Sequence, residues 1–216
     1  MTRFSRGFFA VSLLLLTGLA LVQSASAQNP IVAKYVYGDD ADAGLSFYQE
    51  QDVDRWCWAA TASMIMAFHG RGYWLQCIQA DVAYPGKSSP RTCCDDKESP
   101  LCNRTGWPQF ERYGFHADTT DQLDWDQLVR QIEDQLPIAV AVKFSTGGGH
   151  MGAVVGYQID ENKAQYVLAI DPDGFHEAVL LRFEELFGES VDGLRQHWLT
   201  FLNIMPEEYV AGKVVK

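Results

Sequence analysis

The stretch Gln51-Asp-Val-Asp-Arg-Trp-Cys57-Trp-Ala-Ala60 decides the fold predicted for this chain. From Cys57 to His69 the sequence is rich in alanine and methionine, has no proline or glycine, and stops at Gly70, as a helix with a C-terminal glycine does. Nearly every position in it is small or apolar, so we expect this helix to be buried on most sides. Cys57 then stands at the first turn, where the helix dipole favours a thiolate, and His69 packs at the other end, where an imidazolium suits the dipole.

The later part of the chain changes from a helical to a strand-like pattern. Asp124 and Gln127 form a capping box for a second helix, which Pro137 ends. Beyond it, β-branched and aromatic runs are separated by turn residues, and they occupy residues 138–144, 151–159, 165–170, 177–183 and 197–204. These runs predict an antiparallel meander. A helical half followed by a strand half predicts an α+β fold, with a cleft where the two halves pack.

Five cysteines, at positions 57, 77, 93, 94 and 102, leave one thiol over if the others pair. Cys93 and Cys94 should not pair with each other, because neighbouring Cα atoms lie about 3.8 Å apart and a disulfide usually needs roughly 4.4 to 6.8 Å. If the four clustered cysteines close on themselves, two pairings remain: 77–93 with 94–102, or 77–94 with 93–102. Both pairings leave Cys57 free.

The segment from about 76 to 108 holds those four cysteines together with four prolines, and we expect little regular structure in it. We interpret it as a disulfide-rich insertion. Zinc is the alternative use for the cysteines, but their spacing lacks the C-x-x-C pairs of zinc sites, and an exported chain favours disulfides. We therefore predict no metal site and no cofactor.

Residues 1–27 have the pattern of a secretory signal peptide, with two arginines, an apolar run and the cleavage sequence Ala25-Ser-Ala27. An uncleaved N-terminal anchor is the alternative. Cleavage leaves residues 28–216, which we expect to form a single domain that is secreted or periplasmic, with no stable membrane association. It also removes two positive charges from a chain of net charge −11, which argues against a nucleic-acid partner.

His150 is the strongest candidate partner for a Cys57 thiolate. Cysteine attacks as the thiolate, and a neighbouring imidazolium favours that form. His150 follows three glycines in Thr146-Gly-Gly-Gly-His150, which leave the backbone open to a substrate, and an apolar run after it would hold the ring in place. The pair predicts nucleophilic catalysis by cysteine.

Two further side chains complete this prediction. Asp171 follows the run 165–170 and begins a turn, so its carboxylate would lie at the edge of the sheet beside the His150 strand and fix the imidazole. Asp173, inside the same turn, is the lesser candidate. Gln51, six residues before Cys57, offers a side-chain N–H to the oxyanion that forms when a thiolate attacks a carbonyl.

These residues together resemble the papain-like cysteine peptidases: a glutamine six residues before Cys57, Cys-Trp-Ala opening a helix, a glycine-flanked His150 entering a strand, and a later acid at a strand end. The closest likeness is to the small bacterial branch that contains the avirulence-protein cysteine protease, whose nucleophile lies in Trp-Cys-Trp-Ala-Ala, as at residues 56–60 here. A more distant likeness is to the bacteriocin double-glycine leader peptidases, which share the order Gln, Cys, His, Asp.

The resemblance implies a papain-like fold, with the catalytic helix of the N-terminal half packed on an antiparallel sheet from the C-terminal half. It implies that Cys57 is the nucleophile and His150 the base and acid. Asp171 would orient the imidazole, and Gln51 would bind the oxyanion. The sequence departs from papain at residues 54–56, which replace Cys-Gly-Ser/Ala, in its acidic third member, and in the cysteine-rich segment, so no substrate pocket is carried over.

We therefore expect a secreted, monomeric cysteine endopeptidase that cleaves protein or peptide substrates through a thioester. A transglutaminase, or an amidase acting on another amide, could use the same residues with a different acceptor or substrate. A disulfide-stapled binding module that has kept the fold and lost the reaction is the alternative outside enzymes.

Overall fold

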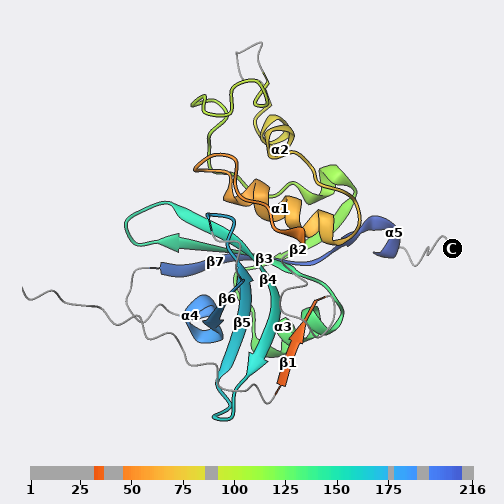
Figure 1. Ribbon diagram of the computed structural model, residues 1–216, viewed down its shortest axis with the longest axis vertical. Helices are drawn as coiled ribbons and strands as arrows, with labels where there is room; N and C mark the ends of the chain where they lie inside the picture. Colours follow the sequence, from red (N-terminus) through yellow and green to blue (C-terminus); the bar gives the residue numbers. More distant parts are fainter. Residues whose placement is uncertain (1–31, 37–45, 86–91, 175–177, 189–194, 211–216) are drawn as a thin grey trace, which may run out of the picture.

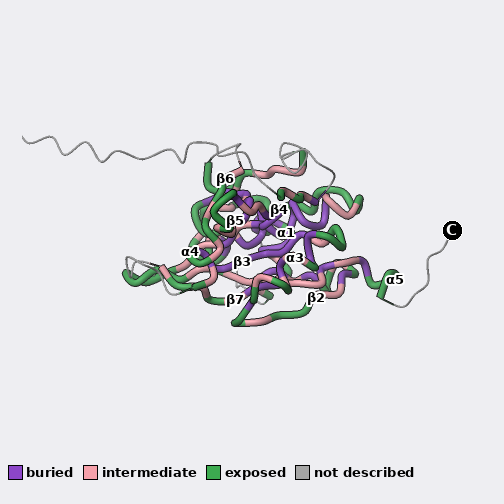
Figure 2. Tube along the Cα trace, turned by 90° about the horizontal axis from the view of Figure 1, so that it is seen from below, coloured by how far each residue is buried: buried purple, intermediate pink, exposed green. Residues whose placement is uncertain are grey.

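The computed structural model describes residues 32–36, 46–85, 92–174, 178–188 and 195–210 (Figure 1). The predicted signal peptide lies outside these residues. Within them, helices pack on an antiparallel sheet, which confirms the predicted α+β class. Figure 2 shows the buried residues gathered around α1 and the central strands.

Seven strands form one sheet in the described part of the chain, and every pair of neighbours is antiparallel. The order is β2-β7-β3-β4-β5-β6, with β1 paired to β4. The strands are β1 Val32–Tyr35, β2 Phe115–Thr120, β3 Ile138–Phe144, β4 Gly149–Ile159, β5 Gln165–Ile170, β6 Ala178–Arg182 and β7 Arg195–Pro206.

The predicted meander is right for β3 to β6 and wrong for the last strand. β7 returns across the sheet to pair with β3, and β2 pairs with its other edge. The prediction missed β2 because its sequence, Phe-His-Ala-Asp-Thr-Thr, buries one residue, Phe115, and shows little alternation. Pairing with the long β7, rather than its own hydrophobicity, makes this segment a strand.

The helices of the described residues are α1 Cys57–Phe68, α2 Gln76–Ala83, η2 Phe110–Tyr113, α3 Trp125–Glu133, α4 Phe183–Phe187 and α5 Glu207–Val210. None of these helices has the length and apolar character needed to cross a bilayer. The predicted capping box of α3 is present: Asp124 accepts a hydrogen bond from the Gln127 main-chain N–H at 2.7 Å, and the Gln127 side chain accepts one in return at 3.1 Å.

Helices α1 and α4 cover opposite faces of the sheet. Ala153 of β4 borders a small cavity with Ile65 of α1, whereas its neighbour Val154 borders another with Leu186 of α4. Successive side chains of a strand point to opposite faces, so the two helices lie on different sides. The long helix α1 is buried from Trp58 to Ala67 against β3 and β4, as its composition predicts.

Helix α2 corrects the expectation of irregular structure after residue 76. Its eight residues contain no proline or glycine, and Pro85 follows just after its end. Gln79 is fully buried and donates hydrogen bonds to the main-chain oxygen of Ala59 at 3.0 Å and to Ser63 Oγ at 2.8 Å, which ties α2 to α1. A polar side chain that serves as the packing contact hides this helix from a search for apolar periodicity.

His69 at the end of α1 differs from the expected imidazolium. Its ring packs against the Phe68 ring, with centroids 5.1 Å apart, and against that of Phe115 at 5.8 Å. Burial lowers the pKa of His69 to about 4, although a hydrogen bond with the Ile204 main chain acts to raise it. The side chain is therefore neutral at pH 7, because desolvation outweighs the main-chain hydrogen bond.

Acidification is expected to destabilise the protein through His69. The pKa of His69 in the folded protein lies below its unfolded value of 6.5, so between these pH values the unfolded chain binds a proton that the folded protein does not. The free energy of unfolding therefore decreases as pH falls from 6.5 towards 4. The loss amounts to at most about 3 kcal/mol. Urea unfolding of wild type and His69→Gln across this range would measure it, and the variant should lose less stability. Parallel pH curves for the two proteins would contradict the assignment.

Candidate active site

Cys57 is the first residue of α1, between two anchored tryptophans. The Trp56 indole is fully buried and donates from Nε1 to the main-chain oxygen of Cys102 at 2.9 Å. The Trp58 indole, also buried, donates to the Arg104 main-chain oxygen at 3.3 Å. Cys57 itself is half-buried and unpaired. The two indoles fix the start of the helix, so the thiol between them has a defined position.

His150 and Asp171 meet because β4 and β5 are paired. His150 is the second residue of β4, and Asp171 directly follows β5. Asp171 Oδ1 accepts a hydrogen bond from His150 Nε2 at 2.6 Å. The same oxygen accepts the main-chain N–H of Asp173 at 2.8 Å, which holds the carboxylate in the turn. The carboxylate bonded to the histidine is that of Asp171.

Cys57 is the second side chain that acts on the His150 ring, and the two residues line the same cavity. Since Asp171 takes Nε2, Nδ1 is the ring nitrogen left for the thiol. Burial works to lower the pKa of His150, but the hydrogen bonds and charges of Asp171 and Cys57 outweigh it and raise the pKa to about 10. The protonated His150 ring therefore lies between the Cys57 sulfur and the Asp171 carboxylate.

Asp171 responds to the same contacts. Burial acts to raise the pKa of Asp171, yet the hydrogen bonds from His150 and the Asp173 main chain bring it below its ordinary value. At neutral pH the carboxylate is therefore ionised while the His150 ring is protonated. A charged acceptor orients the ring and stabilises its protonated form.

Gln51 contacts the turn that follows Asp171. Its main-chain N–H donates to the Pro172 main-chain oxygen at 2.9 Å. Its side-chain Nε2 donates to the Asp54 main-chain oxygen at 3.2 Å and to Asp173 Oδ1 at 3.5 Å. Within the described residues no hydrogen bond joins Gln51 to Cys57. The structure thus brings the glutamine to the turn that carries Asp171, with its amide occupied by two long contacts.

A cavity of about 120 Å³ opens beside the Cys57 thiol. Its walls come from α1, from the end of the cysteine-rich segment, and from β3, β4 and β7. They comprise Cys57, Trp58, Thr105, Gly106, Trp107, Ala141, Gly149, His150, Met151 and Trp198. The rings of Trp107 and Trp198 meet edge to face with centroids 4.8 Å apart. The cavity is therefore a cleft with aromatic walls beside the thiol.

Two glycines of this cleft have no room for a side chain. A Cβ on Gly106 would lie 2.6 Å from Tyr84 Oη, and one on Gly149 would lie 2.6 Å from the Val142 main-chain oxygen. The glycines before His150 were predicted to matter, whereas Gly106 and the tryptophans of the cleft were not predicted. The sequence feature that could have indicated this wall of the cleft is the glycine at 106 directly followed by the tryptophan at 107.

The cysteine-rich segment supports one wall of the cleft. Its disulfides join Cys77 to Cys94 and Cys93 to Cys102, which is the second of the two predicted pairings and leaves Cys57 free. Residues 102–106 then run from the second disulfide to the cleft, past the hydrogen bonds from Trp56 and Trp58. The crosslink therefore lies within a few residues of the substrate cleft.

Replacing both Cys93 and Cys102 by alanine removes their disulfide and is expected to lower the free energy of unfolding by about 2–3 kcal/mol. The two cysteines are 9 residues apart in sequence, and without the crosslink the unfolded chain gains the conformational entropy of the opened loop. The KM for a peptide should rise as well, since the wall at 105–107 loses its support. Denaturant unfolding and steady-state kinetics measure the two effects. An unchanged KM would show that the wall stands without the crosslink.

Comparison with known families decides the class of the chain. A family model described as "Peptidase_C39 like family" matches residues 46–184, which include Gln51, Cys57, His150 and Asp171. The chain belongs to the C39-like peptidase family. It is a cysteine peptidase, and so a hydrolase with a peptide substrate, as the sequence predicts. The predicted resemblance to papain-like cysteine peptidases is confirmed at the level of this family.

Solved structures similar to this C39-like peptidase have low identity. The peptidase domain of Streptococcus ComA, a bi-functional ABC transporter involved in a quorum sensing pathway, is 14% identical over 73% of this chain and 96% of its own, with a TM-score of 0.43. The proform of the ragweed pollen allergen Amb a 11 is 13% identical (82% and 66% covered, TM-score 0.38). The recombinant stem bromelain precursor is 15% identical (81% and 75%, TM-score 0.40). Comparison with the curated proteins finds no match.

Proposed function

We propose that this C39-like peptidase is a secreted endopeptidase that hydrolyses peptide bonds through a thioester on Cys57. The observation that carries the proposal is the hydrogen bond between His150 and Asp171, with the free Cys57 and His150 lining one cleft at the start of a helix. A thiol, an imidazole that holds its proton, and an orienting carboxylate are the parts that covalent acyl transfer requires.

In the proposed reaction the Cys57 sulfur attacks the substrate carbonyl carbon and forms a C–S bond, and the carbonyl oxygen becomes an oxyanion. The His150 imidazolium gives its proton to the amide nitrogen, the C–N bond breaks, and the amine leaves. Water then attacks the thioester while His150 takes one of its protons, and the C–S bond breaks to release the acid. Asp171 keeps the ring oriented throughout.

Gln51 is the proposed side-chain donor to the oxyanion. Its Nε2 contacts with Asp54 and Asp173 are 3.2 and 3.5 Å long, and in this proposal the substrate oxygen replaces one of them. Catalytic hydrogen bonds are often long in the absence of substrate and shorten when it binds. The main-chain N–H of Cys57 at the start of α1 would be the second donor.

Replacing Gln51 by alanine is expected to lower kcat about 10²- to 10³-fold, the usual effect of losing one oxyanion donor. The rate of Cys57 alkylation by iodoacetamide should stay near the wild-type value, because that substitution at carbon forms no oxyanion. The nearby Gln49→Ala is the matched control and should behave as wild type. If Gln51→Ala hydrolyses peptides within about twofold of wild type, the side chain has no such role.

Export, a monomeric state and a closer relationship within the family extend the proposal. Two disulfides suit an oxidising compartment, and the pattern of residues 1–27 suits a signal peptide. Cys57, His150 and Asp171 all come from one chain, so the proposed site needs no second copy. The sequence at 56–60 favours the branch that contains the avirulence-protein protease.

The deciding experiment uses the purified, disulfide-bonded chain with casein and a peptide library, with and without an added primary amine. New amino termini that do not depend on the amine are expected. Incorporation of the amine in place of hydrolysis would indicate a transglutaminase. No turnover and no labelling of Cys57 by a thiol probe would indicate a binding module.

A further inference from the structure

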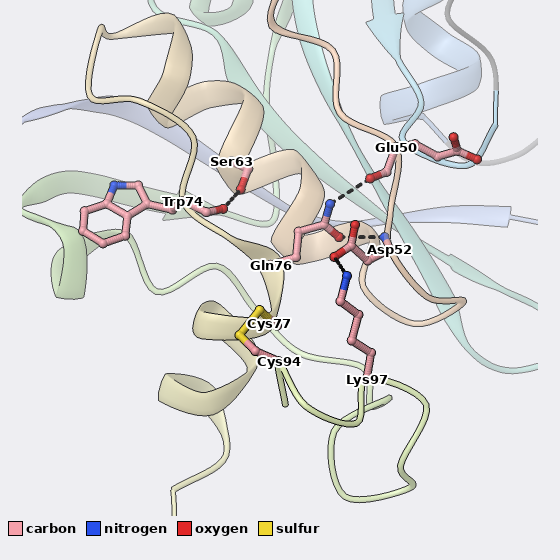
Figure 3. A network of polar contacts seen from close by, with 8 residues as sticks. All are labelled: Glu50, Asp52, Ser63, Trp74, Gln76, Cys77, Cys94 and Lys97. Atoms are coloured by element: carbon pink, nitrogen blue, oxygen red, sulfur yellow. Dashed lines mark hydrogen bonds and ion pairs between the residues drawn. A yellow bond between two sulfur atoms is a disulfide. The ribbon is translucent and has the colours of Figure 1, made fainter. Parts of the chain in front are cut away.

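Gln76, the first residue of α2, forms hydrogen bonds with Glu50 and Asp52, the two neighbours of Gln51 in the chain (Figure 3). Its side-chain Nε2 donates to the main-chain oxygen of Glu50 at 2.7 Å, and its Oε1 accepts the main-chain N–H of Asp52 at 2.9 Å. One carboxamide therefore forms hydrogen bonds with the main chain on both sides of Gln51. Gln76 is 4% exposed, a level of burial at which a polar side chain must satisfy its hydrogen bonds.

We propose that Gln76 is a positioning residue that sets the Gln51 side chain for the oxyanion. This inference rests on the proposed function of Gln51. Gln76 touches neither Cys57 nor the proposed place of the substrate carbonyl, so it acts through the backbone that carries Gln51 and takes no part in the reaction itself.

The backbone of residues 50–52 is fixed from two opposite directions. Gln76 holds the Glu50 oxygen and the Asp52 N–H from the side of α2, and the Pro172 oxygen holds the Gln51 N–H from the side of the Asp171 turn. Three main-chain groups in consecutive residues thus have fixed partners. An oxyanion donor must lie about 2.7–3.1 Å from the oxyanion and be held within about 0.5 Å of that position, and such anchors supply that precision.

The cysteine-rich segment holds Gln76 in turn. Cys77, the next residue, forms the disulfide with Cys94, and Lys97 of the same segment makes an ion pair with Asp52 at 2.5 Å. The ion pair is largely exposed and contributes little by itself. The buried carboxamide of Gln76, next to the crosslink, is the stronger link between this segment and Gln51 (Figure 3).

Neither alanine nor glutamate can take the place of Gln76. Alanine leaves the Glu50 oxygen and the Asp52 N–H without their buried partner. Glutamate keeps the acceptor for Asp52 but has no hydrogen to donate to Glu50. Both variants are expected to lower kcat for peptide hydrolysis at least about tenfold, and Gln76→Glu covers the case in which Gln76→Ala does not fold.

A double-mutant cycle tests the proposal on the full chain. In the Gln51→Ala background, adding Gln76→Ala or Gln76→Glu should change kcat by less than about threefold, because the side chain that Gln76 positions is already gone. Cys57 alkylation by iodoacetamide should keep its wild-type rate in every variant. Gln79→Ala is the matched control: it removes a buried glutamine of α2 that bonds to α1, so it should lower Tm and leave kcat near wild type.

The outcomes separate the two ideas. An inactive wild type overturns the proposed function, and a fully active Gln51→Ala overturns the proposed role of Gln51; either result removes the basis for the role of Gln76. If Gln51→Ala is impaired but Gln76 variants match wild type, only the positioning role fails. If Gln76 substitutions cost the same factor with and without Gln51, or if Gln79→Ala lowers kcat equally, Gln76 acts through general stability and not through Gln51.

Discussion

Cys57→Ala is expected to abolish peptide hydrolysis, with kcat falling by at least about 10⁴-fold, because removing the nucleophile of a cooperating set leaves only the residual effect of binding. The substitution deletes one atom from a half-buried side chain at the first turn of α1, so the fold should persist. Product formation by mass spectrometry, together with Tm from thermal unfolding, measures both effects.

The control for this variant is Cys57→Ser, which keeps the size of the side chain but offers an alcohol where a thiolate is needed. It should be as inactive as the alanine variant. Hydrolysis by Cys57→Ala at a tenth of the wild-type rate or more, in a preparation free of other peptidases, would exclude the thioester route.

Asp171→Ala is expected to lower kcat about 10²- to 10⁴-fold and to change the pH profile. Asp171 is a main reason that the pKa of His150 is raised to about 10, so without it the imidazole loses its proton at lower pH. The alkaline limb of the kcat/KM profile should therefore move down in pH. The same pairing stabilises the fold below pH 6.5, and this contribution is lost as pH rises towards 10.

Asp171→Asn separates charge from orientation. The amide oxygen can still accept the His150 hydrogen bond that is 2.6 Å long here, but the negative charge is gone. We expect activity above that of Asp171→Ala, with the alkaline limb shifted in the same direction. If all three proteins share one alkaline limit, that limit does not report His150. If Asp171→Ala keeps wild-type activity, the carboxylate has no part in the reaction.

The sequence predicted those parts of the fold whose signals are local. The start of α1 at Cys57, the capping box at Asp124 and the ends of β3 all follow from composition, caps and alternation within a few residues. The pairing of β4 with β5 was also predictable, because a short turn joins two strands. That pairing is why Asp171 could be placed beside His150 before any coordinates.

The missed features depend on contacts between distant segments. β7 pairs with β3 across about sixty residues of sequence, and no local pattern specifies that choice over a simple meander. Gln76 and Gln79 lie in a segment for which the sequence predicts little regular structure, and only the packed structure shows that their amides are buried against other backbones. Trp107 and Trp198 meet in the cleft from segments far apart.

The other cysteines of the chain cannot supply a free thiol to reverse oxidation of Cys57. All five cysteines lie in the described residues, and the other four are joined in pairs. Peroxide converts a thiolate to a sulfenic acid, which a neighbouring thiol can trap reversibly before it proceeds to the irreversible sulfinic acid. No second thiol of this molecule is available for that trapping. Recovery of the oxidised protein therefore depends on small thiols from its surroundings, supplied gently enough to spare the two crosslinks.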